Sequence, residues 1–251
     1  MAETWWRPVS DAIATLAQPD PGAVLVDLGC GDGVSLAATA ARVPSAQLIG
    51  LDLRADAMAR AQRKLQDVSF VVADLVQPLP LADRSVDVVI CHNVLELLPD
   101  PAQLVGETAR ALRPGGRAVF SHTDFAGLVI HGADEDLTTR ICHAYSHIKQ
   151  AWMPHIDPRM ARRLPGLVHR SRLRLDTLRT HVLAATRIDG HAAARVDEIT
   201  QAVRSPAAAG ATDLTEHEID TWRRQLATAD QDGDFCFAET AFLAVAAAPA
   251  G

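Results

Sequence analysis

The chain has 251 residues, a net charge of −7 and 48% apolar residues. It is long enough for one full α/β domain, and its acidic balance makes it a poor candidate for electrostatic capture of nucleic acid. Its four cysteines are widely spaced without a C-x-x-C pair, which argues against a zinc ribbon or a disulfide framework and fits a cytoplasmic protein. No apolar run reaches membrane-spanning length, so we expect no membrane partner.

Residues 3–18 predict a short amphipathic helix, which a proline- and glycine-containing break ends. The plain interpretation is a helix that packs on the edge of a sheet. The alternative is a lid in which Trp5 and Trp6 shield a cofactor or substrate.

Residues 24–28 are apolar and β-branched and predict a buried strand. Gly29, Gly31 and Gly33 follow, and an Ala-rich helical pattern starts at Ser35. Strand, glycine turn and helix together let the backbone approach a ligand, and the helix N-terminus offers free N–H groups. We therefore interpret this stretch as a cofactor-binding turn. It departs from the dinucleotide fingerprint G-x-G-x-x-G because the third glycine comes one place early.

A second strand is predicted over residues 47–51 and ends at Asp52. This acid follows the glycine turn at close to the spacing of about 20 residues that is typical of a ribose-binding carboxylate. A carboxylate at the end of a strand can accept hydrogen bonds from both ribose hydroxyls. The alternative is that Asp52 caps a helix over residues 55–66.

Further strands are predicted over residues 69–73, 86–92 and 118–121, with a helix that begins at Asp100 before the last of them. Five strand–helix units in sequence indicate a parallel sheet. In such sheets ligands bind at the carboxyl ends of the strands, and His92 ends the fourth strand.

These segments together resemble the class I S-adenosylmethionine (SAM)-dependent methyltransferases. The resemblance rests on the Asp-Leu-Gly-Cys-Gly-Asp-Gly string at 27–33, on Asp74-Leu75 after the third strand, and on a Leu-Arg-Pro-Gly-Gly turn at 112–116. It covers residues 22–124 and is greatest to small-molecule methyltransferases of the ubiquinone/menaquinone-biosynthesis type. The chain departs from the usual pattern at one place, where Glu96-Leu97 replaces a pair of histidines.

The resemblance implies an α/β fold: a Rossmann-like, seven-stranded, mostly parallel sheet whose last strand is antiparallel, with helices on both faces and a helical substrate cap. We expect one domain over residues 1–251. Its predicted parts are an N-terminal helix or lid (1–21), a SAM-binding core (22–124), cap helices (125–170 and 189–232) and C-terminal strands (171–188 and 234–247).

SAM is the cofactor that the resemblance implies. By the family's pattern Asp74 binds the adenine amino group, although a loop-initiating role for this Asp stays open, and the backbone near Cys91 holds the methionine part. The predicted cofactor-binding residues are Asp27, Gly29, Cys30, Gly31, Gly33, Asp52, Leu53, Ala73, Asp74, Leu75, Cys91 and His92.

The second half of the chain is expected to specify the substrate. A helix from Asp134 carries an apolar stripe that is most simply core, and Tyr145 and Trp152 of this stripe are candidates to line a substrate pocket. His143 and His147 form an i, i+4 pair, but the spacing places no third ligand, so we predict no metal.

The predicted function is methyl transfer from SAM to a small molecule, such as a secondary metabolite or quinone-like precursor, with O-, N- and C-methylation all open. The candidates for a catalytic base are His122, Asp124 and His92, which lie at predicted strand ends. The alternatives are an NAD-dependent oxidoreductase and a SAM-binding protein that transfers no methyl group. A homodimer is a possible assembly.

Overall fold

The apolar run at residues 24–28 forms β1 (Val24–Leu28), the central strand of a parallel sheet in this computed structural model. β1 pairs with β2 (Gln47–Asp52) on one side and with β4 (Val86–His92) on the other. β3 (Val68–Val72) lies outside β2, and β5 (Leu112–Thr123) lies outside β4. The structure describes residues 7–149, 153–205, 208 and 212–250.

The last strand, β8 (Cys236–Ala247), is antiparallel to its neighbours. β5 pairs with its later half, and the edge strand β7 (Arg174–Ala185) pairs along its other side. The short β6 (Val129–His131), which the sequence did not predict, pairs with the first residues of β8 on the same side as β5. β6 therefore continues the position of β5, and with it the described residues form a sheet of eight strands, not the predicted seven. The order confirms the predicted α/β fold with a mostly parallel sheet and an antiparallel last strand.

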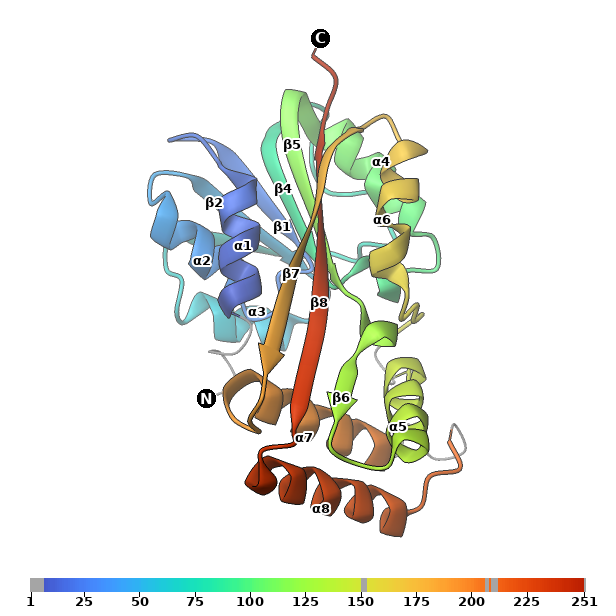
Figure 1. Cartoon of the computed structure of the whole chain (residues 1–251). Helices are drawn as coiled ribbons and strands as arrows, with labels where there is room; N and C mark the ends of the chain where they lie inside the picture. Colours follow the sequence, from blue (N-terminus) through green and yellow to red (C-terminus); the bar gives the residue numbers. More distant parts are fainter. Residues whose placement is uncertain (1–6, 150–152, 206–207, 209–211, 251) are drawn as a thin grey trace.

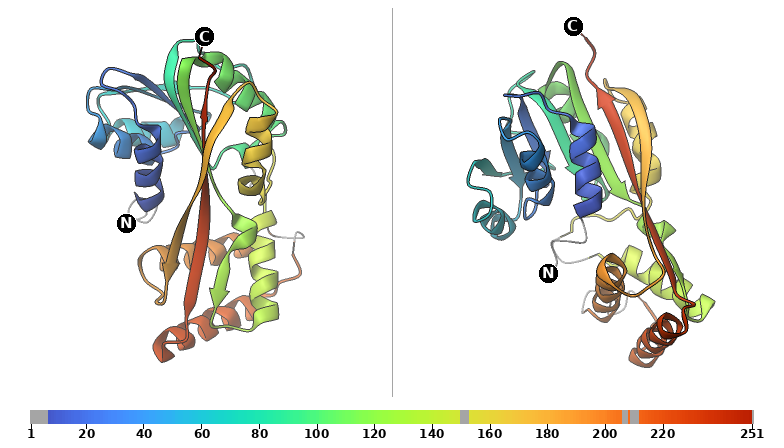
Figure 2. Two further views of the ribbon diagram at one scale, coloured as in Figure 1. Left: turned by 45° about the horizontal axis from the view of Figure 1, so that its top comes forward. Right: turned by 60° about the vertical axis from the view of Figure 1, so that its left-hand side comes forward.

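Helices cover both faces of this sheet because alternate strand residues point to opposite faces. Leu25 of β1 belongs to the apolar cluster on the face covered by α1 (Arg7–Ala17). Val26 belongs to the cluster on the other face, which is covered by α4 (Pro101–Ala111). The two remaining helices of the first face are α2 (Val34–Arg42) and α3 (Ala55–Gln62). The views in Figure 2 show the sheet between these layers.

Helix α1 packs on the sheet through the fully buried Val9, Ile13 and Ala17. This matches the plain interpretation of the N-terminal helix. Trp5 and Trp6 lie outside the described residues, so the lid role stays a prediction.

Helices α5 (Glu135–His147), α7 (Gly190–Arg204) and α8 (Glu216–Asp232) gather at the carboxyl ends of the parallel strands (Figure 1). They surround the first part of β8 and form an apolar cluster of their own. Trp222 of α8 is fully buried there, and its indole N–H donates to Thr138 Oγ1 at 3.1 Å. We call these three helices the cap.

The helix α6 (Met160–His169) is not part of this cap, although the sequence placed it within the predicted cap segment 125–170. Its buried Met160, Leu164 and Val168 belong to the sheet cluster that α4 also covers. An amphipathic stripe predicts that a helix face is buried but not which apolar surface buries it. The single-domain organisation stays a prediction.

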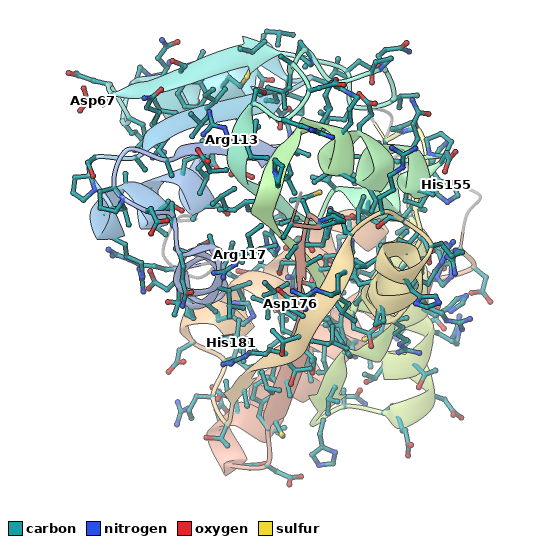
Figure 3. The ribbon with its side chains drawn as sticks, turned by 90° about the horizontal axis from the view of Figure 1, so that it is seen from above. Asp67, Arg113, Arg117, His155, Asp176 and His181 are labelled. Atoms are coloured by element: carbon teal, nitrogen blue, oxygen red, sulfur yellow. The ribbon has the colours of Figure 1, made fainter. Side chains whose placement is uncertain are left out.

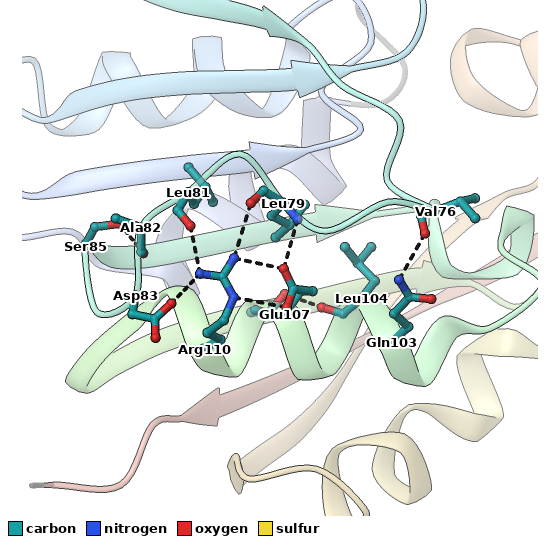
Figure 4. A network of polar contacts seen from close by, with 11 residues as sticks. Val76, Leu79, Leu81, Ala82, Asp83, Ser85, Gln103, Leu104, Glu107 and Arg110 are labelled. Atoms are coloured by element: carbon teal, nitrogen blue, oxygen red, sulfur yellow. Dashed lines mark hydrogen bonds and ion pairs between the residues drawn. The ribbon is translucent and has the colours of Figure 1, made fainter.

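The loop after β3, which carries Asp74, is fastened to α4 by side chains of that helix (Figure 4). Arg110 donates to the carbonyls of Leu79 and Leu81 at 3.2 and 2.8 Å. Gln103 donates to the Val76 carbonyl at 3.0 Å. These contacts fix the position of a loop that has no regular structure of its own.

The amino ends of the strands form the opposite edge of the sheet, which Figure 3 shows from above with Arg113 labelled. Asp87 there accepts a hydrogen bond from the Val24 N–H at 2.8 Å and pairs with Arg113. Burial opposes ionisation of Asp87, but these two partners outweigh it and lower its pKa. This acid therefore anchors the start of β1. None of the described helices has the length and apolar character needed to cross a bilayer.

Candidate functional site

The glycine turn has a left-handed backbone at each of its glycines: φ is +73° at Gly29, +52° at Gly31 and +83° at Gly33. A Cβ added at Gly29 would lie 2.3 Å from Val94 Cγ2, and one at Gly33 would lie 2.9 Å from a methyl group of Leu65. At Gly31 nothing lies within 4 Å of that position. Gly29 and Gly33 are therefore required by packing, whereas Gly31 borders open space where a ligand can approach the backbone.

This difference predicts separable effects of two alanine substitutions. Gly29→Ala should destabilise the fold by about 3 kcal/mol, since left-handed strain and overpacking against Val94 add together. Gly31→Ala should cost only about 1–2 kcal/mol from strain but weaken binding of a ligand at the turn. Gly22→Ala is the matched control, because Gly22 has φ +80° and open space at the opposite edge of the sheet.

Urea unfolding and ligand titration of all three variants check this prediction. Equal losses of ligand affinity in the Gly31→Ala and Gly22→Ala variants would contradict the assignment of the turn as a ligand site.

Asp52 joins the glycine turn to the end of β2. Its Oδ2 accepts a hydrogen bond from Gly31 N–H at 2.8 Å, and its Oδ1 accepts one from Arg54 N–H at 2.7 Å. The N-cap of α3 is Arg54, so Asp52 is not the helix cap that the alternative interpretation required. Leu53 and Val72 nearby are each 60% exposed. An acid flanked by exposed apolar side chains suits a sugar that carries a flat heteroaromatic ring. The ribose role stays a prediction.

Asp27 lies beneath the turn with only 2% of its surface exposed. Burial, followed by the nearby charge of Asp52, raises the pKa of Asp27 to about 8. Among the described residues no hydrogen-bond donor or cation pairs with this carboxyl group. A buried carboxyl group without a partner is costly to ionise and gains most from a cationic ligand.

The other predicted residues of the turn and of the loop after β3 hold their places mainly through packing and backbone contacts. The Cys30 side chain is buried in the sheet core, and its N–H donates to the Leu51 carbonyl at 3.0 Å. Ala73 and Leu75 are buried in the other core cluster. Asp74 is exposed, and its Oδ1 accepts the Val76 N–H at 3.0 Å. This turn geometry fits the loop-initiating alternative for Asp74, and its adenine role stays a prediction.

Cys91 and His92 end β4, but only His92 presents a polar group at the site. The Cys91 side chain is 1% exposed and belongs to the sheet core. Nδ1 of His92 lies 3.1 Å from Ser121 Oγ. Burial, and then the charge of His122, lowers the pKa of His92 to about 3. This imidazole is therefore neutral at physiological pH and a weak base.

His122 is held in a buried ion pair with Glu96, which lies in the short 3₁₀ helix η1 (Leu95–Leu97). Its Nδ1 donates to the Thr123 carbonyl at 2.7 Å, and its Nε2 donates to Glu96 Oε2. Burial by itself lowers the pKa of His122, but the charge and hydrogen bond of Glu96 outweigh it and raise the pKa. With both nitrogens donating, the ring is an imidazolium without a free lone pair. This arrangement disfavours the predicted base role of His122.

Asp124 is also committed to a partner. The guanidinium of Arg162 on α6 contacts both of its carboxylate oxygens, with Nε at 2.9 and 3.1 Å. The pairing ties the end of β5 to α6 and leaves Asp124 as a charged anchor. Base roles for His122, Asp124 and His92 stay predictions, and each requires a contact of this structure to rearrange.

A second buried polar cluster joins the cap to β8 around Arg195 of α7. Arg195 is fully buried, and its Nε donates to Glu239 Oε2 of β8 at 2.8 Å. Its Nη1 donates to Glu198 and to the hydroxyl of Tyr145, at 2.7 and 2.8 Å. The guanidinium carbon lies 5.4 Å from the centre of the Phe125 ring. The carboxylates of Glu198 and Glu239 therefore compensate the buried charge of Arg195, and the Tyr145 hydroxyl is hydrogen-bonded to the same cluster.

A cavity of about 410 Å³ lies between the cap and the end of β4. Tyr145, one of the predicted substrate residues, lines it, and Trp152 lies outside the described residues. His143 and His147 are elsewhere, stacked with ring centres 4.2 Å apart on the exposed face of α5. In the described part of the chain no three His, Cys, Asp or Glu side chains group as metal ligands do.

Sequence reasoning missed Glu96, Arg195 and Glu239. Glu96 carried a signal, since it is a charged residue inside the apolar stretch at 94–98 and departs from the histidine of the resembling family. Glu239 carried a second signal, because it interrupts the apolar pattern of β8. Arg195 carried none, since an arginine in an amphipathic helix is normally exposed.

Comparison with known proteins places these features in a wider context. Residues 26–120 match a family model described as a methyltransferase domain. Over 110 residues the chain is 39% identical to trans-aconitate 2-methyltransferase of Methylobacterium nodulans. The aligned residues make up 44% of this chain and 42% of that protein. The chain thus matches less than half the length of the first curated relatives.

Two solved structures resemble the whole chain. The YcgJ protein of Bacillus subtilis has a TM-score of 0.65 at 18% identity, with coverage of 97% of this chain and 100% of that one. Geranyl diphosphate C-methyltransferase from Streptomyces coelicolor, solved with S-adenosyl-L-homocysteine, has a TM-score of 0.55 at 18% identity, with coverage of 96% and 75%. At these identities the likeness shows the fold.

Proposed function

We propose that the chain transfers a methyl group from SAM to a small molecule, which the match of residues 26–120 to a methyltransferase domain supports. The observation that carries the proposal is the juxtaposition of Gly31, Asp52 and the buried Asp27 at the carboxyl ends of β1 and β2. The accessible backbone at Gly31, the carboxylate of Asp52 beside it, and a buried acid that no cation of the described residues pairs with match the parts of SAM.

The residues of the site fit this cofactor. When bound, SAM supplies a methyl group on a positively charged sulfur. The Gly31 backbone approaches the ligand, Asp52 accepts the ribose hydroxyls, and Asp27 compensates the positive charge of the methionine part. The exposed side chains of Leu53 and Val72 cover the adenine ring.

Transfer from such a cofactor asks the protein mainly for alignment and exclusion of water. The cap lies over the carboxyl ends of the strands and contributes to both functions, because residues of α5 and α7 line its cavity together with η1. The acceptor is then held beside the segment that follows β4, where Val94 packs on Gly29.

The family model matches residues 26–120 and not the cap, so this match supports the donor rather than the acceptor. An NAD-dependent oxidoreductase finds no support in the comparisons. A protein that binds SAM without methyl transfer is separated from the proposal only by product analysis. A small-molecule acceptor fits the cap cavity. The exclusion of nucleic acid, a homodimer and a cytoplasmic location stay predictions from the composition.

Calorimetric titration tests the cofactor. We expect SAM and S-adenosylhomocysteine to bind and NAD not to bind. Incubation of the protein with methyl-labelled SAM and a metabolite extract then tests transfer, with the label expected in a small-molecule product. Absence of heat with both sulfur compounds would overturn the function, and binding without any labelled product would favour the binding-protein alternative.

A further inference from the structure

The cap cavity contains one acidic group whose hydrogen-bonding capacity is half used. Glu96 lines the cavity and is 5% exposed. Its Oε2 accepts the hydrogen bond from His122, while within the described residues its Oε1 has no hydrogen-bond donor. A carboxylate that is more than nine-tenths buried needs donors for both oxygens. Oε1 is therefore open to a hydrogen-bond donor that enters the cavity, either water or a bound molecule.

The charges around the cavity exclude an anionic occupant. Glu96 and Glu198 are the charged side chains that line it, and no Lys, Arg or His does so among the described residues. Each of these acids already has a cationic partner, since Glu96 pairs with His122 and Glu198 pairs with Arg195. Arg195 is in turn compensated by Glu239 as well. A carboxylate or phosphate would face two acids without an available cation, which is strongly unfavourable in a partly buried site.

The remaining lining is mostly apolar. Its apolar residues are Leu97, Phe125, Ile148, Met153, Ile156 and Ala202, and its uncharged polar residues are Tyr145, Ser146, Gln201 and Ser205. Such a lining buries an apolar or aromatic body, while a small number of polar groups fix its orientation. Glu96 of this lining lies two residues after Val94, which packs against Gly29 of the glycine turn.

We propose that this cavity binds the methyl acceptor, that the acceptor is an uncharged apolar molecule with a hydroxyl or amino group, and that Glu96 Oε1 accepts the hydrogen bond of this group. The inference rests on the proposed function, because the cavity is an acceptor site only if the protein transfers a methyl group. It goes beyond that function by assigning the acceptor's chemical class and the residue that selects it.

Matched probes test the assignment by calorimetry on the full chain saturated with S-adenosylhomocysteine. The donors are 4-propylphenol and 4-propylaniline, and their capped counterparts are 4-propylanisole and N,N-dimethyl-4-propylaniline. The anions are 4-propylbenzoate and citrate. We expect the donors to bind at least tenfold more tightly than the capped compounds, and the anions not to bind. Failure of both donors to bind, equal affinity for capped compounds, or tighter binding of an anion would overturn the assignment.

Substitutions at residue 96 link the preference to Glu96. Glu96→Gln should reduce the donor-to-capped affinity ratio several-fold, because the charge on the acceptor oxygen is lost. The double variant Glu96→Leu/His122→Phe removes both members of the buried pair, so no orphaned charge remains, and the ratio should fall to about 1. Glu135→Gln, on the exposed first turn of α5, is the control and should retain the full ratio.

Binding of S-adenosylhomocysteine separates this inference from the proposed function. If the double variant binds S-adenosylhomocysteine and keeps the donor preference of the unmodified protein, Glu96 is not the selecting group. If the unmodified protein does not bind S-adenosylhomocysteine, the proposed function fails first, independently of the probe series.

Discussion

Replacing Asp52 with Asn is expected to weaken SAM binding about 100-fold. The two oxygens of Asp52 accept hydrogen bonds from the N–H groups of Gly31 and Arg54, which holds the carboxylate at the edge of the turn. Each hydrogen bond from a ribose hydroxyl to a charged acceptor contributes about 1.5 kcal/mol or more, so the loss for two is about 3 kcal/mol. Titration calorimetry with SAM measures this loss directly.

The matched control is Asp56→Asn, which makes the same chemical change on the exposed surface of α3. Asp56 pairs with Arg60 at 2.8 Å and does not contact the glycine turn. We expect its SAM affinity to equal that of the unmodified protein. An Asp52→Asn variant that is folded and binds SAM with unchanged affinity would remove Asp52 from the site.

Replacing Asp27 with Asn is expected to abolish a proton release that accompanies SAM binding. The pKa of Asp27 is about 8 in the ligand-free protein because the carboxyl group is buried and lies near Asp52. At pH 7 this group is therefore mostly protonated, and a cationic ligand must displace the proton to gain the negative charge. The affinity of the unmodified protein should rise with pH by up to about tenfold per unit until pH 8.

Calorimetry in two buffers of different ionisation enthalpy counts the protons. We expect the unmodified protein to release close to one proton more than Asp27→Asn at pH 7, and the pH dependence of the variant to be flatter. Titration of the ligand's own amino group is common to both proteins and cancels in the comparison. Equal proton release would contradict the pairing of Asp27 with the ligand cation.

The same substitution, Asp27→Asn, should increase the stability of the folded protein. A folded pKa of about 8 against an ordinary value of 3.8 means that the unfolded chain ionises first as pH rises. Asp27 therefore destabilises the ligand-free protein increasingly between pH 4 and pH 8 and has no such effect below that range. Asp27→Asn should raise the melting temperature at pH 8 more than at pH 5. A site residue that costs stability is typical of function.

Much of the fold was predictable because local patterns specify it. The nearly continuous burial of β1 and β4 follows from short apolar runs, and the structure begins and ends both strands at the predicted residues. The capping box at Thr215 and Glu218 sets the start of α8, as its sequence indicates. Long-range placement was not predictable, as α6 shows, because an apolar stripe is satisfied by any apolar partner.

By itself the sequence determined the strand–turn–helix with its glycines, the acid at the end of β2, and the resemblance to a methyltransferase domain. These features depend on the spacing of residues within one segment, where backbone geometry allows few conformations. Only the tertiary structure decided which acids are ionised and which are paired. The free energy of a buried charge depends on groups that are distant in sequence, as in the pairs Glu96–His122 and Arg195–Glu239. For that reason the cap cavity and the preference that we assign to it became visible only in the folded chain.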